Sequence, residues 1–278
     1  MDYLKYGKQV QQQPQKPQPQ GFEKNNNTQN DFYFGDLNKQ PQDFSKQPQQ
    51  EVSSDNNNNH TGYFTIPSQF NDLGDELLNL FPVPVMICSC PFKYDEELKM
   101  IRKEPCSKKE RRSISNSKSD NTFILNHPEL ERIRSWIETK IKIFTKDTLG
   151  YKNDLFITQS WLNKNKKNEH HHNHNHPNSI VSGIWYPHIH EKLPPIEFRA
   201  EHEKEIQPAR EKFNIYNSGS FSIPMKMGEL VLFPSNLKHS VPMNIFDEER
   251  ISLSFNTWAK GDLGDKEGLT YLPMDRCV

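Results

Sequence analysis

The spacing of apolar residues changes near residue 150 and divides the chain into a helical part and a strand-rich part. From Pro128 to about Lys146, apolar residues recur three or four positions apart, which predicts a helix with one apolar stripe that packs onto a sheet. The stripe consists of Leu130, Ile133, Ile137, Ile141 and Phe144. After Gly150, short and often alternating runs predict strands at 155–163, 179–186, 196–200, 213–216, 220–223, 229–233, 240–244 and 251–258. Eight short strands after one helix predict a closed or two-sheet β-architecture.

The first part of the chain has a different composition. Residues 1 to about 70 are rich in Gln, Asn and Pro and carry few aliphatic side chains, so this segment cannot offset the entropy of ordering it and is predicted to be a disordered tail. The expected organisation is a tail over 1–70, a strand-and-helix support region over 72–150, a β core over 151–262 and a C-terminal tail over 263–278. Within the support region we expect a strand near 83–90 and a polar loop at 107–121.

The charge balance argues against nucleic acid or an acidic membrane surface as a partner. The chain has 35 basic and 36 acidic residues, a formal net charge of −1. No apolar run has the length of a signal peptide or a membrane span, so we expect a soluble, cytoplasmic protein.

The cysteines lack the paired spacing of a zinc site and are interpreted as free thiols. They are Cys88, Cys90, Cys106 and Cys277.

Candidate chemistry begins with a histidine-rich run just before the predicted strand at 179–186. Histidines two apart on an extended backbone point to the same face, so His174 and His176 can bind one metal ion together. Three further histidines, His170, His171 and His172, precede them, so a shift of two residues would select His172 and His174 instead. The tail contains similar Asn-rich runs, and compositional drift is the alternative explanation.

A second constellation follows in GELVLFPSNLKHSV and ERISLSFN. His239 follows the predicted strand at 229–233, and Arg250 directly precedes the predicted strand at 251–258. That strand alternates, with Arg250, Ser252, Ser254 and Asn256 on one face and apolar residues on the other. If the apolar face packs against the helix, the polar face lines a cavity in which a guanidinium can hold a carboxylate by two hydrogen bonds.

The segments HNHPNSIVSGIWY, GELVLFPSNLKHSV and ERISLSFN, in this order, resemble an uncharacterised 2-oxoglutarate/Fe(II) oxygenase family of bacteria and phages, distantly related to the prolyl 4-hydroxylases. The resemblance spans about residues 79–260. It implies a double-stranded β-helix (jelly-roll, cupin-like), Fe(II) as cofactor and 2-oxoglutarate as co-substrate. It matches His174, His176 and His239 to the metal ligands, Arg250 to the residue that binds the far carboxylate of 2-oxoglutarate, and Ser252 to its helper.

This resemblance implies a hydroxylase that uses 2-oxoglutarate and dioxygen to oxidise an organic or peptidyl substrate. The wider superfamily usually has His-x-Asp or His-x-Glu where this chain has His-x-His, so the ligand set here is three neutral imidazoles. Trp161, Asn163 and Tyr186 are candidate cavity-lining residues. Two alternatives remain open: a non-enzymatic cupin-like metal-binding or structural protein, and a three-histidine iron dioxygenase that does not use 2-oxoglutarate.

Overall fold

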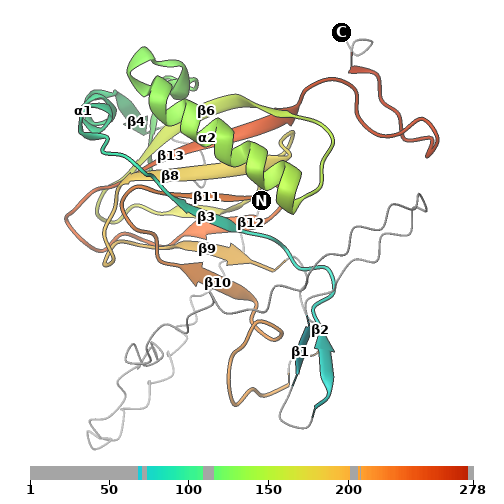
Figure 1. Cartoon of the computed structure of the whole chain (residues 1–278). Helices are drawn as coiled ribbons and strands as arrows, with labels where there is room; N and C mark the ends of the chain where they lie inside the picture. The colour runs from blue at the N-terminus through green and yellow to red at the C-terminus, as the bar shows by residue number, and fades with distance from the viewer. Residues whose placement is uncertain (1–67, 71–73, 109–115, 201–205, 207, 275–278) are drawn as a thin grey trace, which may run out of the picture. The chain divides into compact units, whose positions relative to one another are not determined.

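The computed structural model describes residues 68–70, 74–108, 116–200, 206 and 208–274 (Figure 1). These residues all lie in one compact unit, 65–278. The predicted disordered tail lies outside the described residues except for its last few positions, and so does Cys277. Among the described helices, none is long and apolar enough to cross a membrane.

Eight strands are divided between two facing sheets, which is the fold class that the sequence predicted. They are β6 (Leu155–Asn165), β7 (His171–His174), β8 (Val181–His188), β9 (Ile196–Arg199), β10 (Ser220–Ile223), β11 (Glu229–Pro234), β12 (Lys238–Val241) and β13 (Arg250–Ala259). One sheet contains the order β11-β8-β13-β6 and the other has the order β10-β9-β12-β7, with all of these neighbours antiparallel. This arrangement is a double-stranded β-helix.

Three short strands extend the larger sheet to seven. They are β3 (Met86–Ser89), β4 (Cys106–Lys108) and β5 (Ser117–Ser119), which give the order β3-β11-β8-β13-β6-β5-β4. A separate two-stranded sheet pairs β1 (Ser68–Phe70) with β2 (Glu76–Leu78). The helical elements are α1 (Asp95–Lys103), the 3-10 turns η1 (Ile124–Asn126) and η2 (Pro128–Leu130), α2 (Glu131–Ile143) and a short π-helix, η3 (Phe144–Thr148).

The predicted helix forms as η2, α2 and η3, and its apolar stripe packs on the larger sheet. Ile133, Ile137 and Ile141 of α2 share one core cluster with Leu253 and Phe255 of β13. Figure 1 shows α2 lying across that sheet. The apolar face of β13 therefore faces the helix, which turns its polar face toward the space between the sheets.

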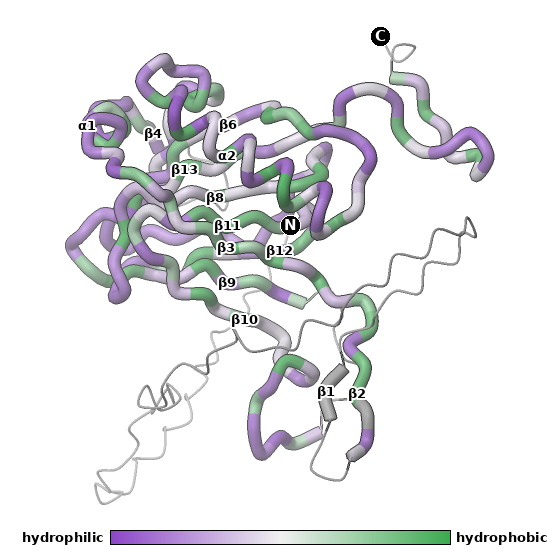
Figure 2. The backbone as a smooth tube through the Cα atoms, in the orientation of Figure 1, coloured by the Kyte–Doolittle hydropathy of each residue, from purple (hydrophilic) through white to green (hydrophobic). Residues whose placement is uncertain are grey.

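A second apolar cluster lies on the opposite side of the larger sheet. It includes Tyr186 of β8, Phe198 of β9 and Val231 and Phe233 of β11. In Figure 2, β11 is coloured largely as hydrophobic, as expected for a strand that is covered on both faces. The two clusters show which residues of β8, β11 and β13 point to each side of the larger sheet.

Two segments differ from the sequence prediction. The segment 213–216, expected to be a strand, is a turn, because the Asn214 side chain accepts hydrogen bonds from the backbone N–H groups of Tyr216 and Asn217. The expected polar loop at 107–121 begins and ends in paired strands, β4 and β5, with Cys106 opposite Ser119. Ser119 is fully buried and its hydroxyl accepts the N–H of Leu162, so this polar segment extends the sheet.

The strand β7 was not among the predicted strands, because its sequence HHNH has no apolar alternation. Its pairing with β12 creates the strand. The thiols of Cys88, Cys90 and Cys106 are free and half-buried.

Candidate metal and carboxylate site

Three histidines from two strands and a loop converge in the structure. His174 ends β7, His176 follows it by two residues, and His239 lies in β12 directly opposite His174. One ring nitrogen of each lies within 4.8 Å of those of the other two. The Nε2 atoms of His176 and His239 are 3.3 Å apart. The pairing of β7 with β12 therefore builds a cluster of three potential metal ligands.

Backbone carbonyls determine which nitrogen is free in two of these rings. Nδ1 of His174 lies 2.8 Å from the carbonyl oxygen of His172, and Nδ1 of His239 lies 3.1 Å from that of Leu237. A carbonyl can only accept, so each Nδ1 carries the proton and each Nε2 presents a lone pair. Metal-binding histidines in proteins commonly make this second hydrogen bond.

The surroundings keep the three rings neutral. Burial lowers the pKa of His176 to about 3 and that of His239 to about 4, and burial also lowers the pKa of His174. Neutral imidazole is the form that binds a metal ion. Phe233 contacts His239 at a centroid distance of 4.8 Å, and Trp161 lies 5.8 Å from the ring of His176. These aromatic side chains limit water around the cluster.

Arg250 is a buried cation with an incomplete set of partners. It begins β13 and is only 1% exposed. Its Nε donates to the carbonyl oxygen of Pro194 at 3.2 Å, and its Nη1 donates to the Ser252 hydroxyl at 3.3 Å. Its Nη2 is buried and has no hydrogen-bond partner among the described residues. A buried charge without an anion is costly, so this arrangement favours a bound carboxylate.

Tyr186 supplies a second open hydrogen-bonding group beside the arginine. The guanidinium carbon of Arg250 lies 5.0 Å from the centroid of the Tyr186 ring. The buried Tyr186 hydroxyl interacts with the Arg250 guanidinium, but it makes no hydrogen bond of good geometry within the described part of the chain. Burial raises its pKa to about 12, although the nearby guanidinium acts in the opposite direction, so the hydroxyl stays protonated and can donate. The Arg250 guanidinium and the Tyr186 hydroxyl thus lie close together in the buried interior, and neither makes its full set of hydrogen bonds.

The rest of the polar face of β13 is buried or half-buried. The Ser254 hydroxyl accepts a hydrogen bond from the Asn163 side chain at 3.0 Å, and the Asn256 side chain accepts one from the Ser182 hydroxyl at 2.9 Å. Ser254 and Asn256 therefore have partners, whereas the buried side chain of Asn165, opposite Arg250, has none among the described residues.

The metal cluster and the arginine belong to the same interior. Partial burial lowers the pKa of His171 to about 2, and His174, His239 and Arg250 each lower it further. His171 is therefore close to both parts of the site. The donor set fits the groups that the sequence implied: three neutral imidazoles suit Fe(II), and the open donors of Arg250 and Tyr186 suit a carboxylate.

The structure brings most of the candidate residues into two groups, whereas Asn163 pairs with Asn116 and Ser254. His174, His176 and His239 form one group, and Arg250 contacts Ser252. Trp161 and Tyr186 lie against members of the site. His172 is not in the group with His239 but in a second group, with His171 and His174. Sequence reasoning gave no separate role to His171, because adjacent histidines on a regular strand point to opposite faces.

Comparison with known proteins identifies the segment that holds this site. Residues 159–256 match the family described as "Putative 2OG-Fe(II) oxygenase". A comparison with curated proteins finds no matching sequence.

The solved structures that match this chain include two bacterial proteins. A 2OG-Fe(II) oxygenase family oxidoreductase from Burkholderia pseudomallei is 13% identical, with a TM-score of 0.44, over 62% of this chain and 83% of that one. A prolyl-4-hydroxylase from Pseudomonas putida is 12% identical, with a TM-score of 0.45, over 64% of this chain and 92% of that one.

The family match covers all three histidines, Arg250 and Ser252. This family uses iron, 2-oxoglutarate and dioxygen. Over residues 159–256, the chain is therefore similar to the 2OG-Fe(II) oxygenase family.

Proposed function

We propose that His174, His176 and His239 hold the ferrous ion and that Arg250, with Ser252 and Tyr186, binds the far carboxylate of 2-oxoglutarate. The reaction would then convert 2-oxoglutarate, dioxygen and a C–H bond of the substrate into succinate, carbon dioxide and an alcohol. The substrate would be an organic or peptidyl molecule. With nearly balanced charge, the chain offers no general attraction to nucleic acid.

The observation that carries this proposal is the open Nη2 of Arg250 beside the open hydroxyl of Tyr186. Arg250 is 1% exposed and Tyr186 is 0% exposed. If these side chains served only to pack the core, apolar residues could take their places. One carboxylate can accept hydrogen bonds from both groups and neutralise the buried cation. A protein that only binds a metal ion, or an iron dioxygenase without 2-oxoglutarate, has no need of this pocket.

The residues of the chain would orient the reactants and exclude water. Arg250 and Tyr186 would fix one end of 2-oxoglutarate, and Trp161 and Phe233 would shield the histidine rings. The carbonyls of His172 and Leu237 would hold the imidazoles of His174 and His239 with Nε2 unprotonated. The bound iron would supply the redox chemistry that couples decarboxylation of 2-oxoglutarate to oxidation of the substrate.

Anaerobic calorimetry tests the two halves of the proposal separately. Metal-free protein is first titrated with Fe(II), and the loaded protein is then titrated with 2-oxoglutarate. We expect one tight metal ion per chain and 2-oxoglutarate binding that depends on that metal. Admitting oxygen should then produce succinate. Loaded wild-type protein that does not bind 2-oxoglutarate would overturn the carboxylate assignment and favour the dioxygenase alternative.

Ligand identity is tested with single substitutions. His176→Ala and His239→Ala should each weaken Fe(II) binding by more than the roughly 10–100-fold that loss of an outer-shell partner produces. His127→Ala, at the start of η2 and outside the cluster, is the matched control and should bind Fe(II) as the wild type does. Unchanged Fe(II) affinity in either cluster variant would remove that residue from the ligand set.

A further inference from the structure

The strand β7 contains one more residue than its partner strand at the histidine cluster. His174 is opposite His239. Two residues further along β12, Val241 is opposite His171, which lies three residues back along β7. The register therefore shifts between these pairs, as in a β-bulge. A bulge changes the direction of side chains on the strand that carries it, so the alternation of faces is interrupted at this point.

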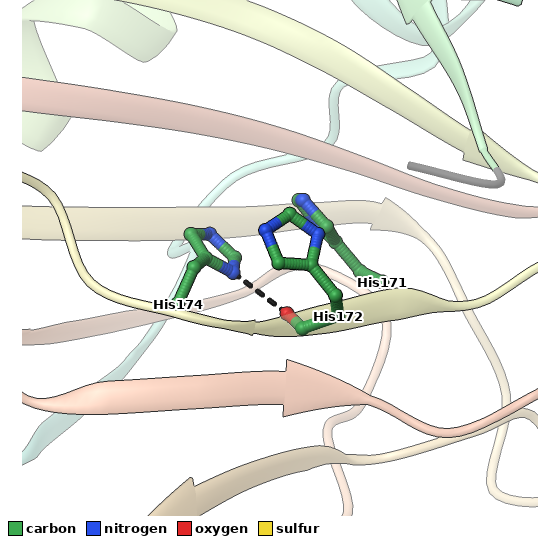
Figure 3. Close-up of side chains that lie close together, drawn as sticks. All are labelled: His171, His172 and His174. Atoms are coloured by element: carbon green, nitrogen blue, oxygen red, sulfur yellow. Dashed lines mark hydrogen bonds between the residues drawn. The ribbon is translucent and has the colours of Figure 1, made fainter. Parts of the chain in front are cut away.

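The interruption places three imidazoles on one side of β7. In Figure 3 the rings of His171, His172 and His174 rise from the same side of the strand. The ring of His171 is stacked on that of His174 at a centroid distance of 4.3 Å, and it lies 5.3 Å from the ring of His172. On a regular strand, His171 would point away from the other two.

These three rings form a second set of potential metal ligands. One ring nitrogen of each lies within 4.8 Å of those of the other two, the same criterion that the first cluster satisfies. Nδ1 of His172 is buried and has no hydrogen-bond partner among the described residues. The three side chains are only half-buried, which leaves access for an ion.

We propose that His171, His172 and His174 form a second binding position for a divalent transition-metal ion of the zinc and nickel class. Imidazole nitrogens suit these ions, and three of them leave a position open for water. The two positions share His174. Because Nδ1 of His174 donates its proton to the carbonyl of His172, only Nε2 can bind an ion, so this residue serves one position at a time.

The shared ligand makes the two positions mutually exclusive for tight binding. An ion at the second position takes His174 away from His176 and His239 and leaves two of the three ligands that we propose for iron. The second position would therefore act as an inhibitory metal site. This consequence rests on the proposed function, but the second position itself does not.

Zinc titration of three variants separates the two positions without any activity measurement. His176→Ala removes a ligand of the first position only. The double variant His171→Ala/His172→Ala removes ligands of the second position only, and the triple variant with His176→Ala as well impairs both. Calorimetry with Zn²⁺ measures affinity and stoichiometry, and the visible spectrum of Co²⁺-loaded protein reports the ligand environment. His127→Ala is the control, and circular dichroism checks the fold of each variant.

We expect about one tight Zn²⁺ per chain in the wild type, in His176→Ala and in the double variant, with different Co²⁺ spectra for the last two. The triple variant should lose tight binding, by more than the roughly 10–100-fold effect of losing an outer-shell partner. Loss of tight binding in folded His176→Ala, with the double variant unchanged, would refute the second position and leave the iron site standing. If the double variant loses tight binding while His176→Ala and His239→Ala keep it, the second position holds and the proposed iron ligands are wrong.

Discussion

The guanidinium of Arg250 lies over the ring of Tyr186, with its central carbon 5.0 Å from the ring centroid. Arg250 starts β13 and Tyr186 lies in β8, the strand that pairs with β13 in the larger sheet. Both side chains are buried, and each keeps one polar atom without a partner among the described residues. This pair is the carboxylate-binding site that we propose.

Arg250→Lys should weaken 2-oxoglutarate binding strongly while Fe(II) binding stays nearly unchanged. Lysine keeps the positive charge but loses the planar fork that engages both oxygens of a carboxylate. Disrupting a buried charged hydrogen bond typically costs about 2–5 kcal/mol, and Arg250→Ala should have a larger effect than Arg250→Lys. Calorimetry on Fe(II)-loaded protein without oxygen measures the change.

The control for this substitution is Arg134→Lys. Arg134 lies on α2 and pairs with Glu138 at the surface. This variant should bind 2-oxoglutarate as the wild type does. Equal affinities for wild type, Arg250→Lys and Arg250→Ala would exclude Arg250 as the carboxylate-binding residue.

Tyr186→Phe should lower the affinity for 2-oxoglutarate with little loss of stability. The hydroxyl lies near the Arg250 guanidinium but makes no hydrogen bond of good geometry within the described residues, so its removal breaks no well-formed hydrogen bond. With ligand bound, the variant lacks one hydrogen bond to a charged group, an effect of roughly 1.5–3 kcal/mol. The matched control is Tyr271→Phe, which removes a hydroxyl that donates to Asp262 at the surface. If Tyr186→Phe binds 2-oxoglutarate as tightly as the wild type, the phenol does not contact the co-substrate.

Gly183→Ala should destabilise the β-helix. A Cβ atom at this position in β8 would lie 2.2 Å from Cζ of Phe255 and 2.7 Å from Cδ2 of Leu232, both in the core. Overpacking of this kind typically lowers the free energy of unfolding by about 1–3 kcal/mol. Gly219→Ala is the control, because nothing lies within 4 Å of its added Cβ. Urea denaturation of the two variants should differ clearly, and equal midpoints would show that the packing around β8 is looser than the structure indicates.

The metal-free protein should lose stability as the pH falls below about 6.5. Burial lowers the pKa of His176 to about 3 and that of His239 to about 4, whereas both are near 6.5 in an unfolded chain. Between these values the unfolded state binds more protons than the folded state, so the free energy of unfolding rises with pH and falls on acidification. Urea denaturation at about pH 7 and about pH 5 measures the slope.

The double variant His176→Gln/His239→Gln should show a shallower pH slope, because glutamine does not titrate. A slope identical to that of the wild type would mean that other groups dominate the acid sensitivity. The comparison must be made without metal, since a bound ion would itself compete with protons for the imidazoles.

The sequence alone determined the class of the fold and the residues of the candidate site. The helical stripe of Ile133, Ile137 and Ile141 and the alternation in β13 are local patterns whose periods, near 3.6 and 2, directly reflect backbone geometry. The motifs around His174, His239 and Arg250 likewise carry their chemistry in side-chain type and spacing. These features could therefore be predicted before any contact was known.

Only the tertiary structure decided how the histidines are shared and which donors stay open. The strand β7 forms because β12 pairs with it, and the bulge that brings His171 beside His172 and His174 is a property of that pairing. The open groups of Arg250 and Tyr186 likewise depend on strands far apart in sequence. Register and burial arise from contacts between distant segments, and the local pattern of residues does not encode them.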